Sequence, residues 1–404
     1  MRLLLCVFLL LFMLLPFGAF ADEQAAIWLA TDLHYISPTL TDHGAYFMRM
    51  IENGDGKIVH YIDEITDALI EQTAKAQPDC LILSGDLTFN GAKKSHEDLA
   101  AKLHAIEDAG VPVYVLPGNH DVFCYSTAAF SGNGYELTQG TTSEDFRTIY
   151  RDFGFDEAIA CDPYSLSYIA EPIPGIRLLM LDVNTQFSSC AVAQNTFSWL
   201  DEVLSSAQQD GAKIIAVSHQ NLYAHSSLLY QGFMIANASM LQSRYEKYGV
   251  SVNLSGHLHM QHTVSGEGIV PEIATSSLAV SPCQYGVITL AKDRASYRTE
   301  ILDVAGWAAR HGKTDPNLLD FSAYARSFFL GSSLRTGQSE DPAAAAFAQW
   351  ISEVNAAYFS GRTDLIPPPP AVDATDVGDF HSAYIASILA ETPRDHTKLG
   401  FPLR

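Results

Sequence analysis

The sequence predicts an α/β fold in which helices cover a sheet and a small helical region follows. Five short segments are nearly continuous in apolar residues, as expected of strands buried on both faces. They are residues 26–30, 81–83, 111–116, 214–217 and 250–254. Helical patterns separate the first three segments. Strand, helix, strand is therefore the repeated unit, which is typical of a parallel sheet.

The two helical patterns cover residues 58–76 and 95–109. Ser95 and Asp98 stand at capping spacing and predict the start of the second helix. Gly110 stands where a helix commonly ends on a left-handed residue, so it predicts the end of that helix.

The organisation changes after residue 302. Strand patterns at 285–290 and 296–301 are followed by helical patterns at 317–329, 342–358 and 377–390, with a tetraproline at 367–370. A run of strands followed by a run of helices predicts a main domain over 22–302 and a small α-helical domain over 303–404. Two roles are open for the second domain: packing beside the functional site to shape access to it, or binding a partner as an independent module.

Chemically active side chains follow each of the five predicted strands. These eight residues are Asp32 and His34, Asp86, Asn119 and His120, His219, and His257 and His259. Ligands of open α/β sheets bind outside the carboxyl ends of the strands, so we expect the eight residues to converge on one site. Leu258 separates the last two histidines, and on an extended backbone this spacing points both imidazoles the same way. His262 falls on the other phase and is expected at the surface or behind the ligands.

The donor set predicts a metal site. It contains carboxylate oxygens, imidazole nitrogens and one amide oxygen, without a thiolate. Such donors suit divalent Mn, Fe, Zn, Co or Ni better than copper(I) or an iron–sulfur cluster. There are more donors than one ion needs, so we expect two divalent ions that share a carboxylate and lie ~3.5–4 Å apart. Mn is favoured, with Fe or Zn as alternatives.

The motifs Asp-x-His, Gly-Asp, Gly-Asn-His-Asp, a lone His and Gly-His-x-His occur in this order between residues 26 and 260. In this respect the chain resembles the calcineurin-like metallophosphoesterase superfamily. The resemblance implies an α/β/β/α sandwich with a binuclear metal site. It assigns Asp32, His34 and His259 to the first metal, Asn119, His219 and His257 to the second, and Asp86 to a bridge between them.

The resemblance also implies a chemistry. The nucleophile of the family is a metal-bound water or hydroxide, because a cation lowers the pKa of water from 15.7 to about 7. His120 stands where the family uses a histidine to help the leaving oxygen depart, as a general acid or a charged hydrogen-bond donor. Asp121 is expected to orient that imidazole; the alternative is that Asp121 closes a turn or caps a helix.

The motif context favours phosphodiester hydrolysis. Ser/Thr protein phosphatases carry Gly-Asp-x-x-Asp-Arg-Gly, whereas residues 85–91 read Gly-Asp-Leu-Thr-Phe-Asn-Gly and lack the arginine that helps hold phosphate. The context resembles bacterial cyclic-nucleotide phosphodiesterases, so we expect a small phosphodiester substrate, with a 3′,5′-cyclic nucleotide favoured. A broad phosphomonoesterase, a sphingomyelinase-like esterase and an exported binding protein with structural metals stay open. Substrate identity is expected to depend on the loops at 43–57 and 125–142.

The N-terminus predicts export. Arg2 precedes an uninterrupted apolar stretch, and residues 19–21 have the A-x-A form of a signal-peptidase site. We expect residues 1–21 to be a signal peptide cleaved before Asp22, which makes the protein secreted or extracytoplasmic. The alternative is an uncleaved membrane anchor, because residues 3–21 approach the length of a membrane span.

Removal of that segment leaves five cysteines, which are Cys80, Cys124, Cys161, Cys190 and Cys283. Cys80 opens a predicted buried strand and is expected to be a core thiol. The other four can form two disulfides, for example between Cys124 and Cys161, or all five can be free thiols.

The charge of the chain restricts its partners. The net charge is −22, and loss of the single positive charge of Arg2 with the signal peptide makes it −23. Such a chain repels nucleic acid, and no cluster of Lys and Arg with interleaved aromatic residues offsets this, so we expect no nucleic acid duplex as a partner. A small phosphodiester is compatible, because metal ions dominate the local field. After signal cleavage we expect no stable insertion into a membrane, and the sequence does not identify protein partners.

Overall fold

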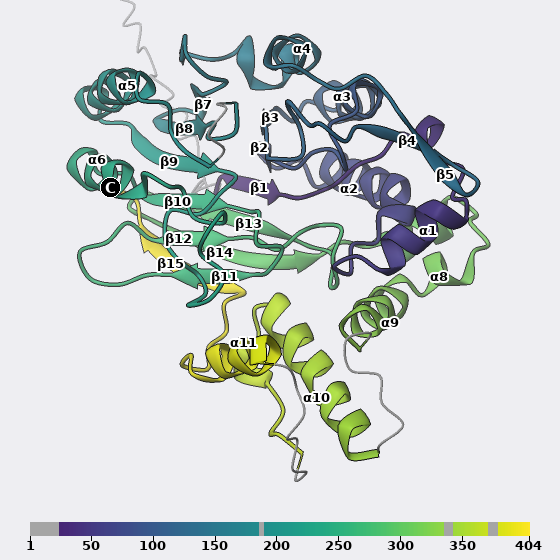
Figure 1. Cartoon of the computed structure of the whole chain (residues 1–404). Coiled ribbons are helices and arrows are strands. Elements are labelled where there is room, and N and C mark those ends of the chain that lie inside the picture. The colour runs from purple at the N-terminus through teal and green to yellow at the C-terminus, as the bar shows by residue number, and fades with distance from the viewer. Residues whose placement is uncertain (1–23, 186–189, 335–341, 371–378) are drawn as a thin grey trace, which may run out of the picture.

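The computed structural model describes residues 24–185, 190–334, 342–370 and 379–404 (Figure 1). The predicted signal peptide at 1–21 lies outside the described residues, as do the first two residues of the helix predicted at 377–390. Within the four described ranges, no helix combines the length and the apolar character that crossing a membrane would require.

Two β-sheets form the centre of the structure. The first contains β1 (Ala26–Ala30), β2 (Cys80–Ser84), β3 (Val113–Leu116), β13 (Gln284–Leu290), β14 (Arg294–Ile301) and β15 (Lys398–Pro402), in the spatial order β15-β14-β13-β1-β2-β3. The second contains β6 (Ala160–Cys161), β7 (Tyr168–Ile173), β8 (Ile176–Leu181), β9 (Lys213–Ser218), β10 (Val252–Ser255), β11 (His262–Val264) and β12 (Glu272–Ala274), in the order β11-β12-β10-β9-β8-β7-β6. A separate hairpin consists of β4 (Ala128–Ser131) and β5 (Gly134–Leu137).

The helices of the main part are α1 (Ala45–Glu52), α2 (Ile62–Ala76), α3 (Lys93–Asp108), α4 (Ser143–Ile149), α5 (Thr196–Asp210) and α6 (Ala238–Tyr248). The helices of the C-terminal region are α7 (Val304–Arg310), α8 (Pro316–Leu319), α9 (Phe321–Leu334), α10 (Pro342–Phe359) and α11 (Asp379–Leu389).

The two sheets pack face to face between two layers of helices. In β8, Leu178 and Met180 belong to the core that includes the first sheet, whereas Leu179 and Leu181 belong to a second core with α5 and α6. This alternation shows that the second sheet is buried on both faces. Helices α2 and α3 cover the first sheet (Figure 1). The predicted α/β/β/α sandwich with C-terminal helices is confirmed.

The five strands predicted first are present as β1, β2, β3, β9 and β10, each within two residues of its predicted ends. Strands β1, β2 and β3 are parallel, and so are β8, β9 and β10. The first predicted helix is α2, preceded by a 3₁₀ turn at Val59–Tyr61. The polar clusters therefore follow the carboxyl ends of parallel strands, as the sequence predicts.

The second predicted helix, α3, begins at Lys93, two residues before the predicted cap. Ser95 does not cap it, because Ser95 Oγ accepts the backbone N–H of Ser37, and the hydroxyl of Ser37 donates to Asp98. Both side chains thus join α3 to the segment after β1. Gly110, just after the helix, has a φ of 91°, as its predicted role requires.

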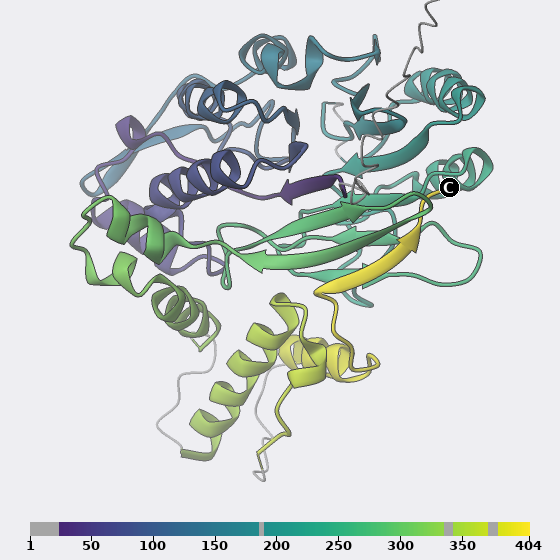
Figure 2. The same cartoon turned by 180° about the vertical axis from the view of Figure 1, so that it is seen from behind.

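The patterns used above do not predict β15. This strand follows the C-terminal helices and pairs antiparallel with β14 at the edge of the first sheet (Figure 2). The C-terminal helices are therefore tied back to the main sheet at their end.

Helices α10 and α11 pack against the segment that carries the last two predicted ligands. Trp350 and Val354 of α10 and Ile388 of α11 share a core with Leu258 and Met260. This contact agrees with the interpretation that the helical region packs beside the functional site.

Phe329 of α9 is a buried contact between the C-terminal region and the main part. We expect Phe329→Ala to lower the free energy of unfolding by about 3–5 kcal/mol, because truncation of a buried phenylalanine leaves a cavity. Urea unfolding followed by circular dichroism measures this. Phe123→Ala is the matched control: Phe123 is 45% exposed, so the change should stay within about 0.5 kcal/mol. A loss for Phe329→Ala no larger than that of the control would contradict the prediction.

The five cysteines named above lie in the described ranges, and within these ranges no two of them form a disulfide bond. Of the two alternatives, the structure therefore agrees with the one without disulfides, and Cys124 is not bonded to Cys161. Cys80 is buried in β2, as predicted for a core thiol.

Candidate metal centre

The predicted site residues follow the carboxyl ends of five strands and lie close together. Asp32 and His34 follow β1, Asp86 follows β2, Asn119 and His120 follow β3, His219 follows β9, and His257 and His259 follow β10. The first sheet supplies three of these loops and the second sheet supplies two. Because both sheets contribute, the site lies where their carboxyl edges meet.

Four of the predicted ligands form a first group. Asp32, His34, Asp86 and His259 each place a donor atom within 4.8 Å of the others. The Nε2 atoms of His34 and His259 are 3.1 Å apart, and His259 Nε2 is 3.4 Å from Asp32 Oδ1. Two carboxylates and two imidazoles thus surround a single point.

Asp86 also belongs to a second group, together with His219 and His257. Asp86 Oδ2 is 3.3 Å from His219 Nε2, and Asn119 Oδ1 is 3.2 Å from the same nitrogen. The structure therefore brings all seven predicted ligands together, in two groups that share the carboxylate of Asp86.

The donors of these groups fit divalent cations. Asp32 Oδ1 is buried and has no hydrogen-bond partner in the part of the chain that the structure describes. Buried polar atoms without a partner cost free energy unless a ligand satisfies them. Carboxylate and imidazole donors are suited to Mn, Fe and Zn. The two groups are therefore a candidate dimetal site.

The charges within the groups favour cation binding. Burial alone would raise the pKa of Asp32, but His219 and His259 outweigh burial and hold that pKa well below its usual value. Burial would likewise lower the pKa of His219, yet the carboxylates of Asp86 and Asp32 raise it to about 9. The carboxylates therefore stay ionised at neutral pH and can bind a cation, which would displace the proton that they hold on His219.

Five of the seven predicted ligands have a left-handed backbone conformation. They are Asp32 (φ 52°), His34 (φ 50°), Asp86 (φ 46°), His257 (φ 68°) and His259 (φ 58°). This conformation costs a non-glycine residue about 1–3 kcal/mol, and such residues cluster at functional sites. The chain accepts this strain where it turns sharply after a strand and directs donors into the site.

Hydrogen bonds orient the ligands from behind. His219 Nδ1 donates to the carbonyl of Ser84 at 2.9 Å, which leaves Nε2 of the neutral ring unprotonated and able to bind a cation. Asp32 Oδ2 accepts the hydroxyl of Thr31 at 2.7 Å and the backbone N–H of His257 at 2.9 Å. Oδ1 of Asp32 is thereby left for a cation.

The glycine of the Gly-Asn-His-Asp motif permits a close approach. A Cβ atom at Gly118 would lie 2.2 Å from both the backbone nitrogen and Oδ1 of Asp86. Only glycine fits there, because Asp86 N is a main-chain atom that cannot move aside. The motif therefore needs glycine to hold the bridging carboxylate.

His120 lies at the edge of the two groups. Its side chain is 40% exposed, its Nε2 is 4.0 Å from Asp86 Oδ2, and its Nδ1 donates to the carbonyl of Phe89 at 3.0 Å. The prediction that Asp121 orients this imidazole is wrong. The buried carboxylate of Asp121 instead accepts the backbone N–H groups of Leu87 and Gly118, and thus closes the loops after β2 and β3.

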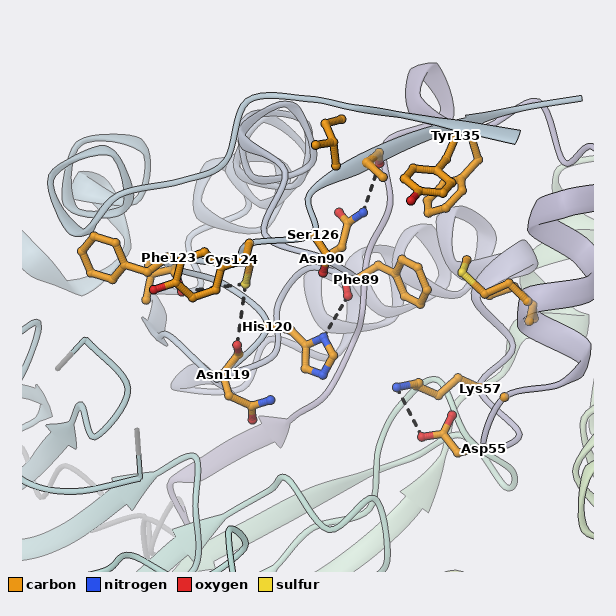
Figure 3. Close-up of a pocket in the computed structure, with 18 of the residues that line it drawn as sticks. Asp55, Lys57, Phe89, Asn90, Asn119, His120, Phe123, Cys124, Ser126 and Tyr135 are labelled. Atoms are coloured by element: carbon orange, nitrogen blue, oxygen red, sulfur yellow. Dashed lines mark hydrogen bonds and ion pairs between the residues drawn. The ribbon is translucent and has the colours of Figure 1, made fainter. Parts of the chain in front are cut away.

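A pocket of about 970 Å³ opens beside the two groups (Figure 3). Asn119 and His120 line it. Both loops that were expected to determine the substrate also line it, the first through Tyr46 and the second through Tyr125 and Tyr135. The pocket is therefore bounded by Asn119 of the candidate dimetal site and by both loops.

Two charged residues at this pocket, Asp55 and Lys57, belong to the loop expected at 43–57, but no motif marks either of them. Asp55 Oδ2 is 3.4 Å from His259 Nδ1 and 3.3 Å from Lys57 Nζ. Residues 53–57 read Asn-Gly-Asp-Gly-Lys, which indicates a turn and carries no sign of chemistry. Only the fold brings this turn to the ligands.

His262 is buried, which excludes the first of its two expected positions, the surface. Its Nδ1 is 3.0 Å from Nδ1 of His225, and its Nε2 is 3.4 Å from Glu391 at the end of α11. His396 lies in the same cluster, but its Nδ1 accepts the backbone N–H of Thr263, so the neutral ring keeps its proton on Nε2. This cluster is a hydrogen-bonded contact between the C-terminal region and the second sheet.

The metallophosphoesterase class has two packed sheets and two clusters of Asp and His ligands that share one carboxylate. This chain has both features. Residues 25–261 match the calcineurin-like phosphoesterase family, and the chain belongs to that family. Residues 303–395 match the C-terminal domain of cyclic nucleotide phosphodiesterase. The resemblance predicted from the motifs is confirmed, including the cyclic-nucleotide phosphodiesterase branch.

A probable cyclic nucleotide phosphodiesterase of Pseudoalteromonas sp. (strain SM9913) is 37% identical over 101 residues, which are 24% of this chain and 33% of that protein. The match thus spans about a third of the length of this relative. A dimetal phosphatase from Danio rerio is 12% identical with a TM-score of 0.48, covering 68% of this chain and 95% of that one. A purple acid phosphatase from yellow lupin (Lupinus luteus) is 14% identical with a TM-score of 0.47, covering 69% of this chain and 52% of that one.

Proposed function

We propose that this protein is a binuclear-metal phosphodiesterase acting on a small phosphodiester, with a 3′,5′-cyclic nucleotide as the favoured substrate. The observation that carries the proposal is the position of Asp86. Its carboxylate belongs to both ligand groups, and the partly exposed imidazole of His120 lies beside it at the pocket. This arrangement suits in-line displacement at a phosphoryl group.

The proposed ligands are Asp32, His34, Asp86 and His259 for one ion, and Asp86, Asn119, His219 and His257 for the other. Two divalent ions held there, with Mn favoured, would supply positive charge to phosphoryl oxygens and would lower the pKa of a bound water molecule.

His120 is the proposed proton donor to the leaving oxygen. The carbonyl of Phe89 accepts the Nδ1 proton and holds the ring, so the imidazolium form has its second proton on Nε2. That proton is available to the oxygen that departs from phosphorus. A rigid carbonyl orients the ring without competing for the Nε2 proton.

Three features support a small phosphodiester. A pocket of about 970 Å³ lies in the range of small-molecule sites, about 300–1,000 Å³. Phe89, Phe123 and Tyr125 line it, and aromatic rings can stack on a nucleobase. The net charge of −22 opposes a nucleic acid duplex.

We infer from the N-terminal sequence that the protein is exported. The apolar stretch after Arg2 and the A-x-A sequence at 19–21 support cleavage before Asp22. The mature chain then acts outside the cytoplasm without a stable membrane insertion.

The test is a comparison of initial rates for the Mn²⁺-loaded mature chain, residues 22–404, on bis-p-nitrophenyl phosphate, p-nitrophenyl phosphate and cyclic AMP. We expect both diesters to be hydrolysed faster than the monoester. A preference for the monoester would move the assignment to a phosphatase. Binding of two metal ions without turnover on any of the three would favour an exported binding protein.

A further inference from the structure

Lys57 is the basic residue of the pocket. Among the described residues that line the pocket, Lys57 is the only lysine or arginine. Its side chain is 14% exposed, and Nζ is 3.3 Å from Asp55 Oδ2. Figure 3 shows the amine directed toward the space beside His120. In a chain with a net charge of −22, a single ammonium group is therefore placed where the substrate would bind.

The ammonium group lies next to the first ligand group without belonging to it. Asp55 Oδ2 lies 3.3 Å from Lys57 Nζ and 3.4 Å from His259 Nδ1, so this carboxylate stands between the lysine and a predicted ligand. Lys57 is therefore close enough to act on charges at the metal centre.

The backbone of Lys57 is fixed on its C-terminal side by the main part of the protein. Lys57 forms an antiparallel bridge with Val280, and the N–H of Ile58 donates to the carbonyl of Ala279 at 2.8 Å. Residues 279 and 280 closely follow Ser277, whose hydroxyl donates to the carbonyl of Asp32. Lys57 is thus anchored to the segment that supports the first ligand.

The C-terminal region holds the same loop from its other side. The hydroxyl of Ser332 in α9 donates to the carbonyl of Gly54 at 2.8 Å. A Cβ atom at Gly56 would lie 2.8 Å from Phe329 of α9, so the loop and the helix are in close contact. The loop is therefore held between α9 and the segment at 279–280, which limits the positions open to Lys57.

We propose that Lys57 binds a non-bridging oxygen of the substrate phosphoryl group through its ammonium. This inference rests on the proposed function and extends it. Residues 85–91 lack the arginine that helps Ser/Thr protein phosphatases hold phosphate. Lys57 supplies a positive charge from a different loop. A lysine acts as a point charge and does not require the planar, bidentate geometry of an arginine.

The test uses the Mn²⁺-loaded full mature chain and compares wild type with Lys57→Gln. Loss of one charge-assisted hydrogen bond predicts a drop in kcat/KM for bis-p-nitrophenyl phosphate of about 10- to 150-fold. The dissociation constant for inorganic phosphate, measured by calorimetry, should rise by a comparable factor. Lys57→Arg should recover part of the kcat/KM and part of the phosphate affinity that Lys57→Gln loses. Lys313→Gln is the matched control, because Lys313 lies between α7 and α8, is 40% exposed and pairs with Glu64 of α2.

The outcomes separate this inference from the proposed function. If wild type is active, and Lys57→Gln has the same kcat/KM and the same phosphate affinity, the role of Lys57 is overturned and the proposed function is not. A loss of metal ions in Lys57→Gln would overturn that role as well, because Lys57 would then act through Asp55 on His259. If wild type hydrolyses none of the esters, the proposed function fails, and phosphate affinity still decides whether Lys57 binds the phosphoryl group.

Discussion

Asp86→Asn is expected to prevent occupation of both metal positions and to lower diester hydrolysis about 10³-fold or more. Asp86 is the residue common to both ligand groups, so its charge serves two ions at once. Metal ions contribute several kcal/mol of charge stabilisation to phosphoryl transfer, and each 1.36 kcal/mol corresponds to about a tenfold change in rate. Asparagine keeps Oδ1, which accepts the backbone N–H of His120 at 2.8 Å, so the loop geometry should survive the loss of charge.

Metal content per chain, determined by elemental analysis after Mn²⁺ loading and gel filtration, measures this effect directly. Added Mn²⁺ should raise the Tm of wild type but not of Asp86→Asn, because a ligand that binds only the folded state stabilises it. Asp156→Asn is the matched control, since Asp156 is an exposed carboxylate paired with Arg151. Two ions retained by Asp86→Asn at a near wild-type rate would show that Asp86 is not the shared ligand.

The parallel strands and the ligand clusters could be predicted because their signals are local. Ala26–Ala30 is a continuous apolar run, and its predicted ends coincide with those of β1. Asp32 and His34 follow it directly, and the same relation between strand end and polar cluster recurs at Asp86 and His219. The rule that ligands bind at the carboxyl ends of parallel strands then places these residues together without knowledge of the side-chain contacts.

Other features depend on contacts between distant parts of the chain and have no local signal. Ser95 stands at capping spacing, yet its hydroxyl accepts from Ser37, 58 residues earlier. Asp121 follows the motif histidine, yet its carboxylate is used by backbone N–H groups of two loops. Lys57 belongs to a polar turn whose position depends in part on Phe329 of α9, far along the chain. Propensity and motif order carry no information about such pairings.

His120→Ala is expected to reduce hydrolysis of cyclic AMP about 10²–10⁴-fold, the range of general acid–base catalysis. Hydrolysis of bis-p-nitrophenyl phosphate should fall much less. The alkoxide that leaves cyclic AMP is strongly basic and needs a proton as its bond to phosphorus breaks, whereas p-nitrophenolate departs as a stable anion. Initial rates on both substrates, measured side by side, therefore test for proton donation and not only for loss of charge.

The metal centre should be unaffected in this variant. His120 belongs to neither ligand group, and the backbone N–H that donates to Asp86 Oδ1 is present in alanine as well. Metal content should thus equal that of wild type. His311→Ala is the matched control, because His311 is 47% exposed at the end of α7 and should leave both rates unchanged. An equal loss on both substrates would assign His120 to charge stabilisation of the phosphoryl group, and no loss on either would remove His120 from the mechanism.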